Sequence, residues 1–256
     1  MATVHSATDF LAMLRPPTVP TSPHASVREF IVVPEDMSLE RAVAAGIQTG
    51  QHVVVKPGEY NLSATLCVPG RLNLRADANG AGGEVRVLGT CVFTGPHASG
   101  GTGGHVKGIS FVGCGGDCIR VEGGVWSFHN FSFACTASPV RLSSSALWVS
   151  CGKVSLFACT VGQAATNGIV ACGNAAVEAD MCKISGAIFG VGCADSALLE
   201  LKGCDVFENS SAFAAGARPF NSTLHVLDCT VHDNKTIWWN DKFRPKQVKS
   251  ARNTGF

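Results

Sequence analysis

The residues best suited to chemistry are charged side chains that recur at a fixed distance in the second half of the chain. Three pairs are separated by the same interval in sequence: Glu178 and Glu200, Asp180 and Lys202, Lys183 and Asp205. Two carboxylates about 5–9.5 Å apart are what glycoside hydrolysis requires. Alternating opposite charges instead stabilise a solvated sheet face, by about 0.2–1 kcal/mol per pair. We expect a solvated face and keep these six residues, with His129, as a candidate ligand-binding face.

The spacing of these charges follows from an apolar-x-x-apolar-x-apolar motif that recurs along the chain at nearly regular steps, with one longer step before Cys159. The copies are Val106/Ile109/Phe111, Phe128/Phe131/Phe133, Leu156/Cys159/Val161, Ala179/Cys182/Ile184, Leu201/Cys204/Val206 and Val226/Cys229/Val231. A period of this size indicates stacked supersecondary units that bury their apolar edges against their neighbours. Equivalent positions then form rows on the outer surface. One such row, on the N-terminal side of each central residue, contains His105, Ser127, Ser155, Glu178, Glu200 and His225.

The cysteines occupy motif positions that other copies fill with Ile or Phe, so we interpret them as reduced thiols in the core. Two inward rows are expected: Cys159, Cys182, Cys204 and Cys229 form one, and Cys151, Cys172 and Cys193 the other. With Met1 to Leu14 lacking the basic start and apolar run of a secretory signal, this predicts a cytoplasmic or intracellular protein. No stretch is apolar for long enough to span a bilayer.

Three segments are predicted. Residues 1–28 form an arm with a Pro-rich linker, residues 29–234 form the repeat body, and residues 235–256 form a basic, aromatic tail. The body begins with a strand at Phe30–Val33 and a helix at about Leu39–Ile47, which Ser38 caps and which covers the first open coil. Short strands follow, the first of them ended by Pro57-Gly58.

The helix, the segment Val53-Val54-Val55-Lys56-Pro57-Gly58-Glu59-Tyr60 and the short strands after it resemble the start of right-handed parallel β-helices of the pectate-lyase superfamily. The chain is more similar still to the carbohydrate-binding and sugar-hydrolysis type repeats of F-box-only proteins. This resemblance implies an all-β, right-handed parallel β-helix of about eight coils. A leucine-rich repeat is the rival, since two copies fit L-x-x-L-x-L-x-x-N. It requires helical returns, whereas Ile169–Ala171, Ile188–Val191 and Ala212–Ala214 read as strands.

The resemblance implies no particular activity, because the superfamily carries many functions. Gly104-His105-Val106 begins like the Gly-His-Gly of polygalacturonases but lacks the second Gly and the aspartates. The acidic cluster of lyases and the Asp-Pro-His-Glu of uronate epimerases are also missing. Cys114-x₃-Cys118 alone does not make a zinc site. We therefore expect no cofactor or metal, and the sequence disfavours an enzyme without excluding one.

The tail holds six Lys or Arg residues and one Asp, in a chain whose net charge is +1. Trp238 and Trp239 are expected to plug the last coil. Phe243, Arg244, Lys246, Lys249 and Arg252 form a candidate surface for a protein partner or for self-association. Nucleic acid is disfavoured. The leading hypothesis is a non-enzymatic structural or interaction module, a component of a larger assembly; the alternative is a carbohydrate-binding or carbohydrate-active protein.

Overall fold

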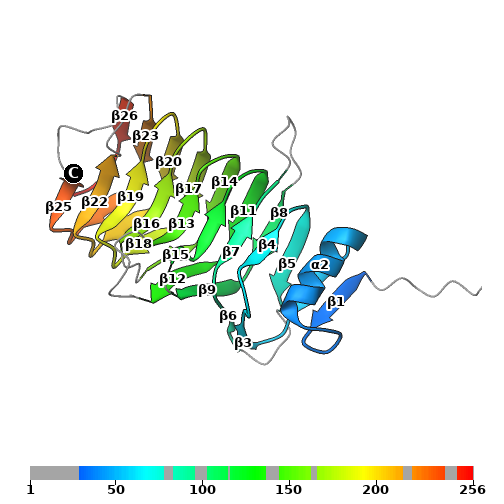
Figure 1. Ribbon diagram of the computed structural model, residues 1–256. Helices are drawn as coiled ribbons and strands as arrows, with labels where there is room; N and C mark the ends of the chain where they lie inside the picture. Colours follow the sequence, from blue (N-terminus) through cyan, green and yellow to red (C-terminus); the bar gives the residue numbers. More distant parts are fainter. Residues whose placement is uncertain are drawn as a thin grey trace, which may run out of the picture.

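A computed structural model describes residues 29–77, 83–95, 103–114, 116–136, 144–162, 166–215, 221–239 and 247–255. The described chain is an all-β parallel solenoid of about eight turns built from three sheets, with one short helix near its N-terminal end (Figure 1). The predicted fold class is therefore confirmed. The arm over residues 1–28 lies outside the described residues, and its predicted linker is untested.

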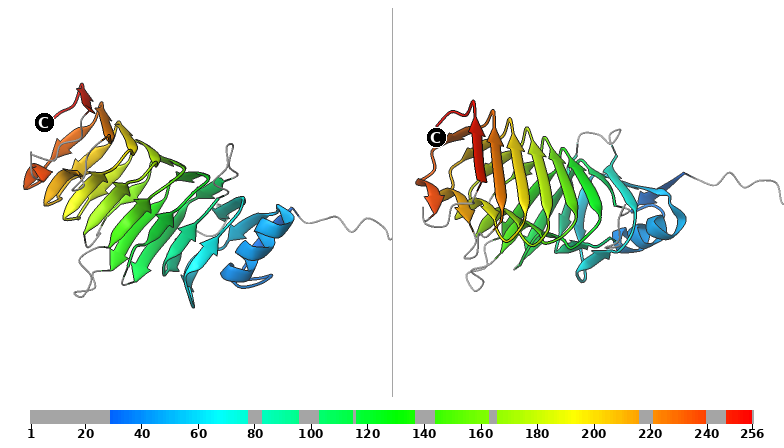
Figure 2. Two further views of the ribbon diagram at one scale, coloured as in Figure 1. Left: turned by 45° about the horizontal axis from the view of Figure 1, so that its top comes forward. Right: turned by 90° about the horizontal axis from the view of Figure 1, so that it is seen from above.

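Each turn contributes one strand to each sheet, in the order sheet A, sheet B, sheet C. Sheet A has ten strands, which lie side by side along the solenoid in Figure 2. They are β1 (Phe30–Val33), β2 (His52–Val55), β5 (Leu72–Ala76), β8 (Gly104–Lys107), β11 (Val125–His129), β14 (Lys153–Phe157), β17 (Ala176–Asp180), β20 (Leu198–Lys202), β23 (Thr223–Leu227) and β26 (Gln247–Ala251).

Sheets B and C have eight strands each. Sheet B contains β3 (Gly58–Asn61), β6 (Val85–Leu88), β9 (Ile109–Cys114), β12 (Ser132–Thr136), β15 (Thr160–Val161), β18 (Lys183–Ser185), β21 (Asp205–Phe207) and β24 (Thr230–His232). Sheet C contains β4 (Leu66–Val68), β7 (Cys91–Phe93), β10 (Ile119–Val121), β13 (Ser145–Val149), β16 (Asn167–Ala171), β19 (Phe189–Cys193), β22 (Ser211–Ala215) and β25 (Thr236–Trp239).

The recurring apolar motif is the corner between sheets A and B. In one copy Leu201 is the last inward residue of β20, Cys204 lies in the corner, and Val206 is the inward residue of β21. The next copy stacks on it, with Leu201 paired to Val226 and Val206 to Val231. The step in sequence is thus the length of one coil, as predicted.

The chain turns sharply at this corner because one residue there adopts a left-handed conformation. This residue directly precedes the central residue of the motif. In four copies it is not glycine but Asn130, Ala158, Met181 or Asp228, and its φ angle lies between 49° and 55°. Non-glycine residues rarely take this conformation, and packing of the surrounding coil must hold them there. The residues before and after the corner therefore face different directions.

The core is a thin column of aliphatic, phenyl and thiol groups. Cys159, Cys182, Cys204 and Cys229 are each about 1% exposed, so the first predicted cysteine row is confirmed as inward. All twelve cysteines are free. Hydrogen bonding with Cys182 and burial raise the pKa of Cys204 to about 12, which keeps this thiol protonated and unreactive.

The second predicted cysteine row is wrong. Val149 pairs with Ala171 and Ala171 pairs with Cys193, so the offset between coils of sheet C is one residue longer than the cysteine spacing. Because side chains alternate along a strand, a shift of one residue reverses the face. Only Cys193 points into the core at this level, while Cys151 and Cys172 are half-buried.

Helix α2 (Leu39–Thr49) packs against β1, β2, β4 and β5 at the end of the solenoid where the chain enters. It buries Leu39, Ala42, Val43 and Gly46 and leaves Ile47 half-buried. Ser38 occupies the N-cap position but makes no side-chain capping bond, contrary to expectation. As the described residues contain no helical return between coils, the leucine-rich repeat is excluded.

The sheets continue beyond the predicted end of the body at residue 234. β25 and β26 extend sheets C and A, so part of the basic segment forms the last coil. Trp238 packs against the core, with 5.3 Å between its ring centroid and that of Phe213, as expected for a plug, whereas the side chain of Trp239 lies outside the part that the structure describes. In the described part of the chain, no helix combines the length and apolarity needed to cross a bilayer.

Candidate functional site

The outer face of sheet A carries one continuous polar row. Strand pairing places these residues next to one another in the order His52, Asn73, His105, Ser127, Ser155, Glu178, Glu200, His225 and Lys249. Neighbouring strands lie about 4.8 Å apart. The row predicted from the sequence is therefore confirmed, and it places polar side chains next to one another along the length of the solenoid.

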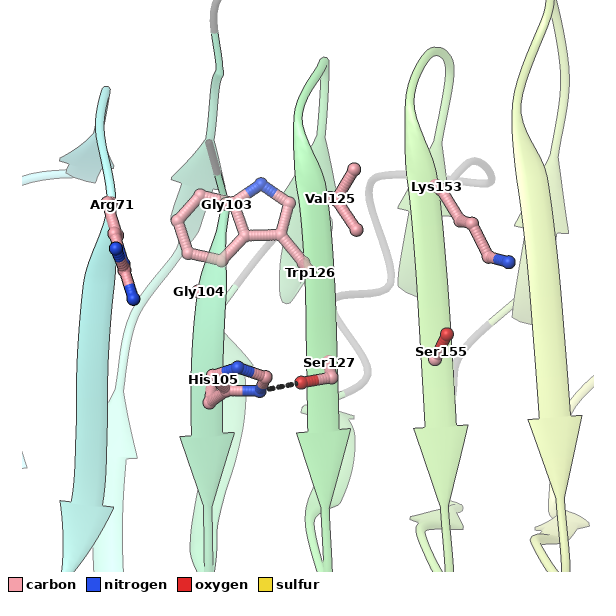
Figure 3. Close-up of a pocket in the computed structure, with 9 residues that line it drawn as sticks. All are labelled: Arg71, Gly103, Gly104, His105, Val125, Trp126, Ser127, Lys153 and Ser155. Atoms are coloured by element: carbon pink, nitrogen blue, oxygen red, sulfur yellow. Dashed lines mark hydrogen bonds between the residues drawn. The ribbon is translucent and has the colours of Figure 1, made fainter. Parts of the chain in front are cut away.

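A groove of about 530 Å³ opens on this face at β8, β11 and β14. Figure 3 shows His105 and Ser127 side by side at its centre, with Arg71 on one flank and Lys153 and Ser155 on the other. A second hollow of about 200 Å³, lined by His52, Asn73 and the end of α2, shares Arg71 with the first. Together they form a trough across the first five strands after β1.

Glycine opens the groove. Gly103 lies in the row between Arg71 and Val125, and a Cβ there would stand 1.4 Å from the Val125 carbonyl oxygen. A Cβ on Gly104 would stand 1.8 Å from the Leu72 oxygen. Only glycine permits such close approach of backbones. The floor of the groove is consequently backbone, with the indole of Trp126 fully buried below.

Trp126 is fixed from inside the core. Its Nε1–H donates to the Gly123 carbonyl at 2.9 Å, and its ring packs edge-on to Phe93 with 4.8 Å between centroids. Alternation along β11 then directs Ser127 outward. The buried neighbour thus sets the direction of the Ser127 hydroxyl.

His105 Nδ1 and Ser127 Oγ share a hydrogen bond across neighbouring strands. When Nδ1 is unprotonated, the serine hydroxyl donates to it. An imidazole that accepts a hydroxyl proton is the arrangement that activates serine as a nucleophile. His105 is exposed and Ser127 half-buried, so a ligand in the groove can reach both.

The two cations that flank the pair have different surroundings. Lys153 Nζ lies 2.7 Å from Glu178 Oε1, which turns the ammonium toward the next strand (Figure 3). Arg71 has no ion-pair partner among the residues that the structure describes. It is therefore the cation best placed to meet an anionic ligand.

The charge of sheet A changes sign along the solenoid. The outward positions of β2, β5, β8, β11 and β14 hold His, Lys and Arg residues but no Asp or Glu. Carboxylates begin at Glu178 and Asp180 on β17. The half that contains the groove is thus the basic half.

The predicted site residues were expected to share one face, and this expectation is wrong. Glu178, Asp180, Glu200 and Lys202 lie on β17 and β20 of sheet A, whereas Lys183 and Asp205 lie on β18 and β21 of sheet B. The sequence rows were correct, but the left-handed corner residue turns the chain between them. His129 lies on β11 of sheet A, in the same row as Asp180 and Lys202.

The acidic half has the character of a solvated face. Glu200 makes a weak contact with His225 at 3.3 Å. On sheet B, His232 lies between Asp233 and Asp205, at 2.7 and 3.0 Å, and stacks on Phe207. The hydrogen bond to Asp233, and then that to Asp205, raise the pKa of His232. Several of these carboxylates thus already interact with basic side chains of the chain itself.

The candidate partner-binding tail is only partly described. Arg252 is salt-bridged to Asp228, at 2.6 and 2.7 Å, so it is already engaged within the chain. Lys249 belongs to β26, and Phe243, Arg244 and Lys246 lie outside the described residues. Binding of a partner or self-association through the termini remains a prediction.

Sequence reasoning missed Arg71 and Lys153, because neither belongs to the rows counted from the motif. The available signal was the single-coil step from His105 to Ser127, directly after a Gly-rich run. In the part of the chain that is described, no group of three or more His, Cys, Asp or Glu residues is arranged to hold a metal ion.

Comparison with known proteins identifies the fold. No family model and no curated protein matches the sequence. Among solved structures, pectin methylesterase from carrot superposes with a TM-score of 0.57 at 14% identity, over 91% of this chain and 84% of the other. Escherichia coli YbhC gives 0.53 at 10% identity, over 94% and 87%. Pectate lyase Pel9A gives only 0.37, at 12% identity over 78% and 72%.

The chain has the fold of the right-handed β-helix superfamily. This confirms the resemblance to the pectate-lyase superfamily, whereas nothing shows a link to F-box-only proteins. The leading hypothesis of a non-enzymatic module has to be corrected. Of the two structures that superpose with a TM-score above 0.5, the carrot protein is an esterase by its printed name, which favours the alternative interpretation.

Proposed function

We propose that this is a carbohydrate-active protein that binds a carboxylate-bearing polysaccharide across the basic half of sheet A and hydrolyses an ester of it. The observation that carries the proposal is the hydrogen-bonded pair of His105 and Ser127, exposed at the centre of a groove between two cations. Ester hydrolysis is consistent with the name of the carrot structure.

The shape and charge of the trough support a polymeric, anionic ligand. Five strands spaced about 4.8 Å apart give a run of roughly 20 Å, which suits several residues of an extended chain. Arg71 offers a planar guanidinium that can bind a carboxylate through two hydrogen bonds. The acids that begin at Glu178 repel such a ligand, so we place its chain over β2 to β14.

The two central side chains supply the parts of a hydrolysis in two steps. Ser127 Oγ attacks the ester carbonyl carbon while its proton passes to His105 Nδ1. The carbon–oxygen bond to the alcohol breaks, and His105 returns the proton to the departing alcohol oxygen. Water then attacks the serine ester and gives a proton to His105. The bond between the acyl carbon and Ser127 Oγ then breaks, Oγ takes this proton back from His105, and the acid product leaves as a carboxylate after giving its proton to solvent.

The experiment combines binding and turnover on one panel of polysaccharides. Methyl-esterified polygalacturonate, its saponified form and a neutral glucan would be tested by affinity electrophoresis, and methanol release would be measured on the first. We expect both polygalacturonates to bind more tightly than the glucan. Ser127→Ala should retain binding and lower methanol release at least about a hundredfold, the usual scale for losing an acid–base or nucleophilic group.

Ser132→Ala provides a matched control, because it removes a half-buried hydroxyl from the outer face of sheet B, away from the groove. It should leave methanol release unchanged. Full turnover in Ser127→Ala would eliminate the nucleophile. Absence of binding to every polysaccharide would remove the proposed function as a whole.

A further inference from the structure

The ring of Phe157 is a feature of sheet A that the proposed hydrolysis does not use. It is 42% exposed, and Phe30 is the other large exposed aromatic residue among those described. Phe30 is covered by the Arg75 guanidinium at 5.3 Å and lies 5.8 Å from the His52 ring. Phe157 instead neighbours His129, with 5.9 Å between ring centroids and 42° between ring planes.

These two rings lie next to the groove on β11 and β14, two of the three strands on which it opens. Phe157 follows Ser155 by two positions on β14, and His129 follows Ser127 by two positions on β11. Two steps along a strand cover about 7 Å, and both side chains point outward. A polysaccharide that crosses β2 to β14 and turns along the strands at β11 and β14 would therefore place the unit next to the one in the groove over the rings.

Polar groups border the ring pair on both sides. Lys107 pairs with His129 on the strand before, and Asp180 pairs with Phe157 on the strand after. The row therefore reads ammonium, imidazole, phenyl, carboxylate. An apolar surface with a donor at one edge and an acceptor at the other matches a ligand with an apolar face and a polar rim.

We infer that Phe157 and His129 form a sugar-stacking subsite that holds a pyranose ring of the polysaccharide next to the reacting unit. The axial C–H bonds of the sugar lie against the phenyl ring, and its hydroxyl groups reach Asp180 and Lys107. This inference rests on the proposed function, since the polysaccharide is the same. Phe157 and His129 contribute binding and positioning, and the reacting atoms remain those of His105 and Ser127.

Three substitutions at Phe157 separate ring stacking from simple apolar area. Phe157→Tyr keeps a flat ring, Phe157→Leu keeps apolar area without the ring, and Phe157→Ala removes both. Binding to polygalacturonate should be nearly unchanged in the first and about five- to tenfold weaker in the other two, as expected for loss of an aromatic contact. With methyl-esterified polygalacturonate, KM should rise by a similar factor while kcat changes little.

Leu198→Ser is the matched control, because Leu198 is an exposed apolar residue of the same sheet, 39% exposed and three strands from β11. It should bind like the wild type. Equal affinity of Phe157→Leu and wild type would overturn the stacking role. The stacking role would also be overturned if the wild type bound poly(dT) in place of the polysaccharide and Phe157→Ala lost that affinity. If the wild type binds no polysaccharide at all, the proposed function fails and this subsite with it.

Discussion

The buried amide of Asn209 offers the sharpest test of how the coils are held in register. Asn209 is 2% exposed and lies at the corner between sheets B and C. Its side-chain oxygen accepts the Ala187 N–H at 3.1 Å, and its amide group contacts the carbonyl oxygens of Phe207 at 2.9 Å and Ile184 at 3.2 Å. It also donates to Asn234 Oδ1 at 3.0 Å. One side chain thus connects three coils.

Asn209→Ala removes all of these bonds. The Ala187 N–H is then buried without its partner, which costs about 1–3 kcal/mol, and each lost bond to an oxygen costs about 0.5–1.5 kcal/mol. We expect the free energy of unfolding to fall by about 4 kcal/mol in total. Guanidinium chloride unfolding followed by circular dichroism would measure it as a lower midpoint at constant slope.

Asn174→Ala is the control, since Asn174 is exposed in a turn. It should change stability by no more than about 0.5 kcal/mol. Asn209→Asp tests the direction in which stability changes with pH. Its ionised carboxylate would face the oxygens of Phe207 and Ile184, so its pKa in the folded state would be raised and stability should fall as the pH rises through about 4. Equal midpoints for Asn209→Ala and wild type would refute this account, as would an Asn209→Asp variant that gains stability with rising pH.

Two further predictions concern the surface and the groove. The raised pKa of His232 means that its ion pairs stabilise the folded protein fully below the unfolded pKa of about 6.5 and lose this effect as the pH rises through the folded pKa. The difference in melting temperature between wild type and His232→Gln should therefore shrink from pH 5 to pH 8, and a constant difference would exclude the charge effect. Gly104→Ala places a Cβ against the Leu72 oxygen and should lower the melting temperature, whereas Gly116→Ala meets nothing within 4 Å and should not. Equal melting temperatures for these two variants would show that the strands can separate at no cost.

The length of the coil and the direction of most core side chains could be predicted from the sequence. Residues such as Phe131, Cys182 and Cys204 recur at nearly constant spacing, and a stacked coil is the arrangement that buries them all. The outward row through His105 and Ser127 followed from the same count. The spacing of the cysteines near sheet C led to a wrong prediction, an inward row of Cys151, Cys172 and Cys193. The segment that separates Ala171 from its partner Cys193 is one residue longer than that spacing implies.

The groove itself depends on tertiary structure. Arg71 and Lys153 are far apart in sequence and become neighbours of one hollow because they lie beside β5 and on β14 of the same sheet. The hydrogen bond between His105 and Ser127 likewise needs two strands in register. The separation of Lys183 and Asp205 from the other charges depends on a left-handed residue at the corner. A sequence period specifies how far apart equivalent residues are, whereas backbone angles and strand register determine which side chains meet.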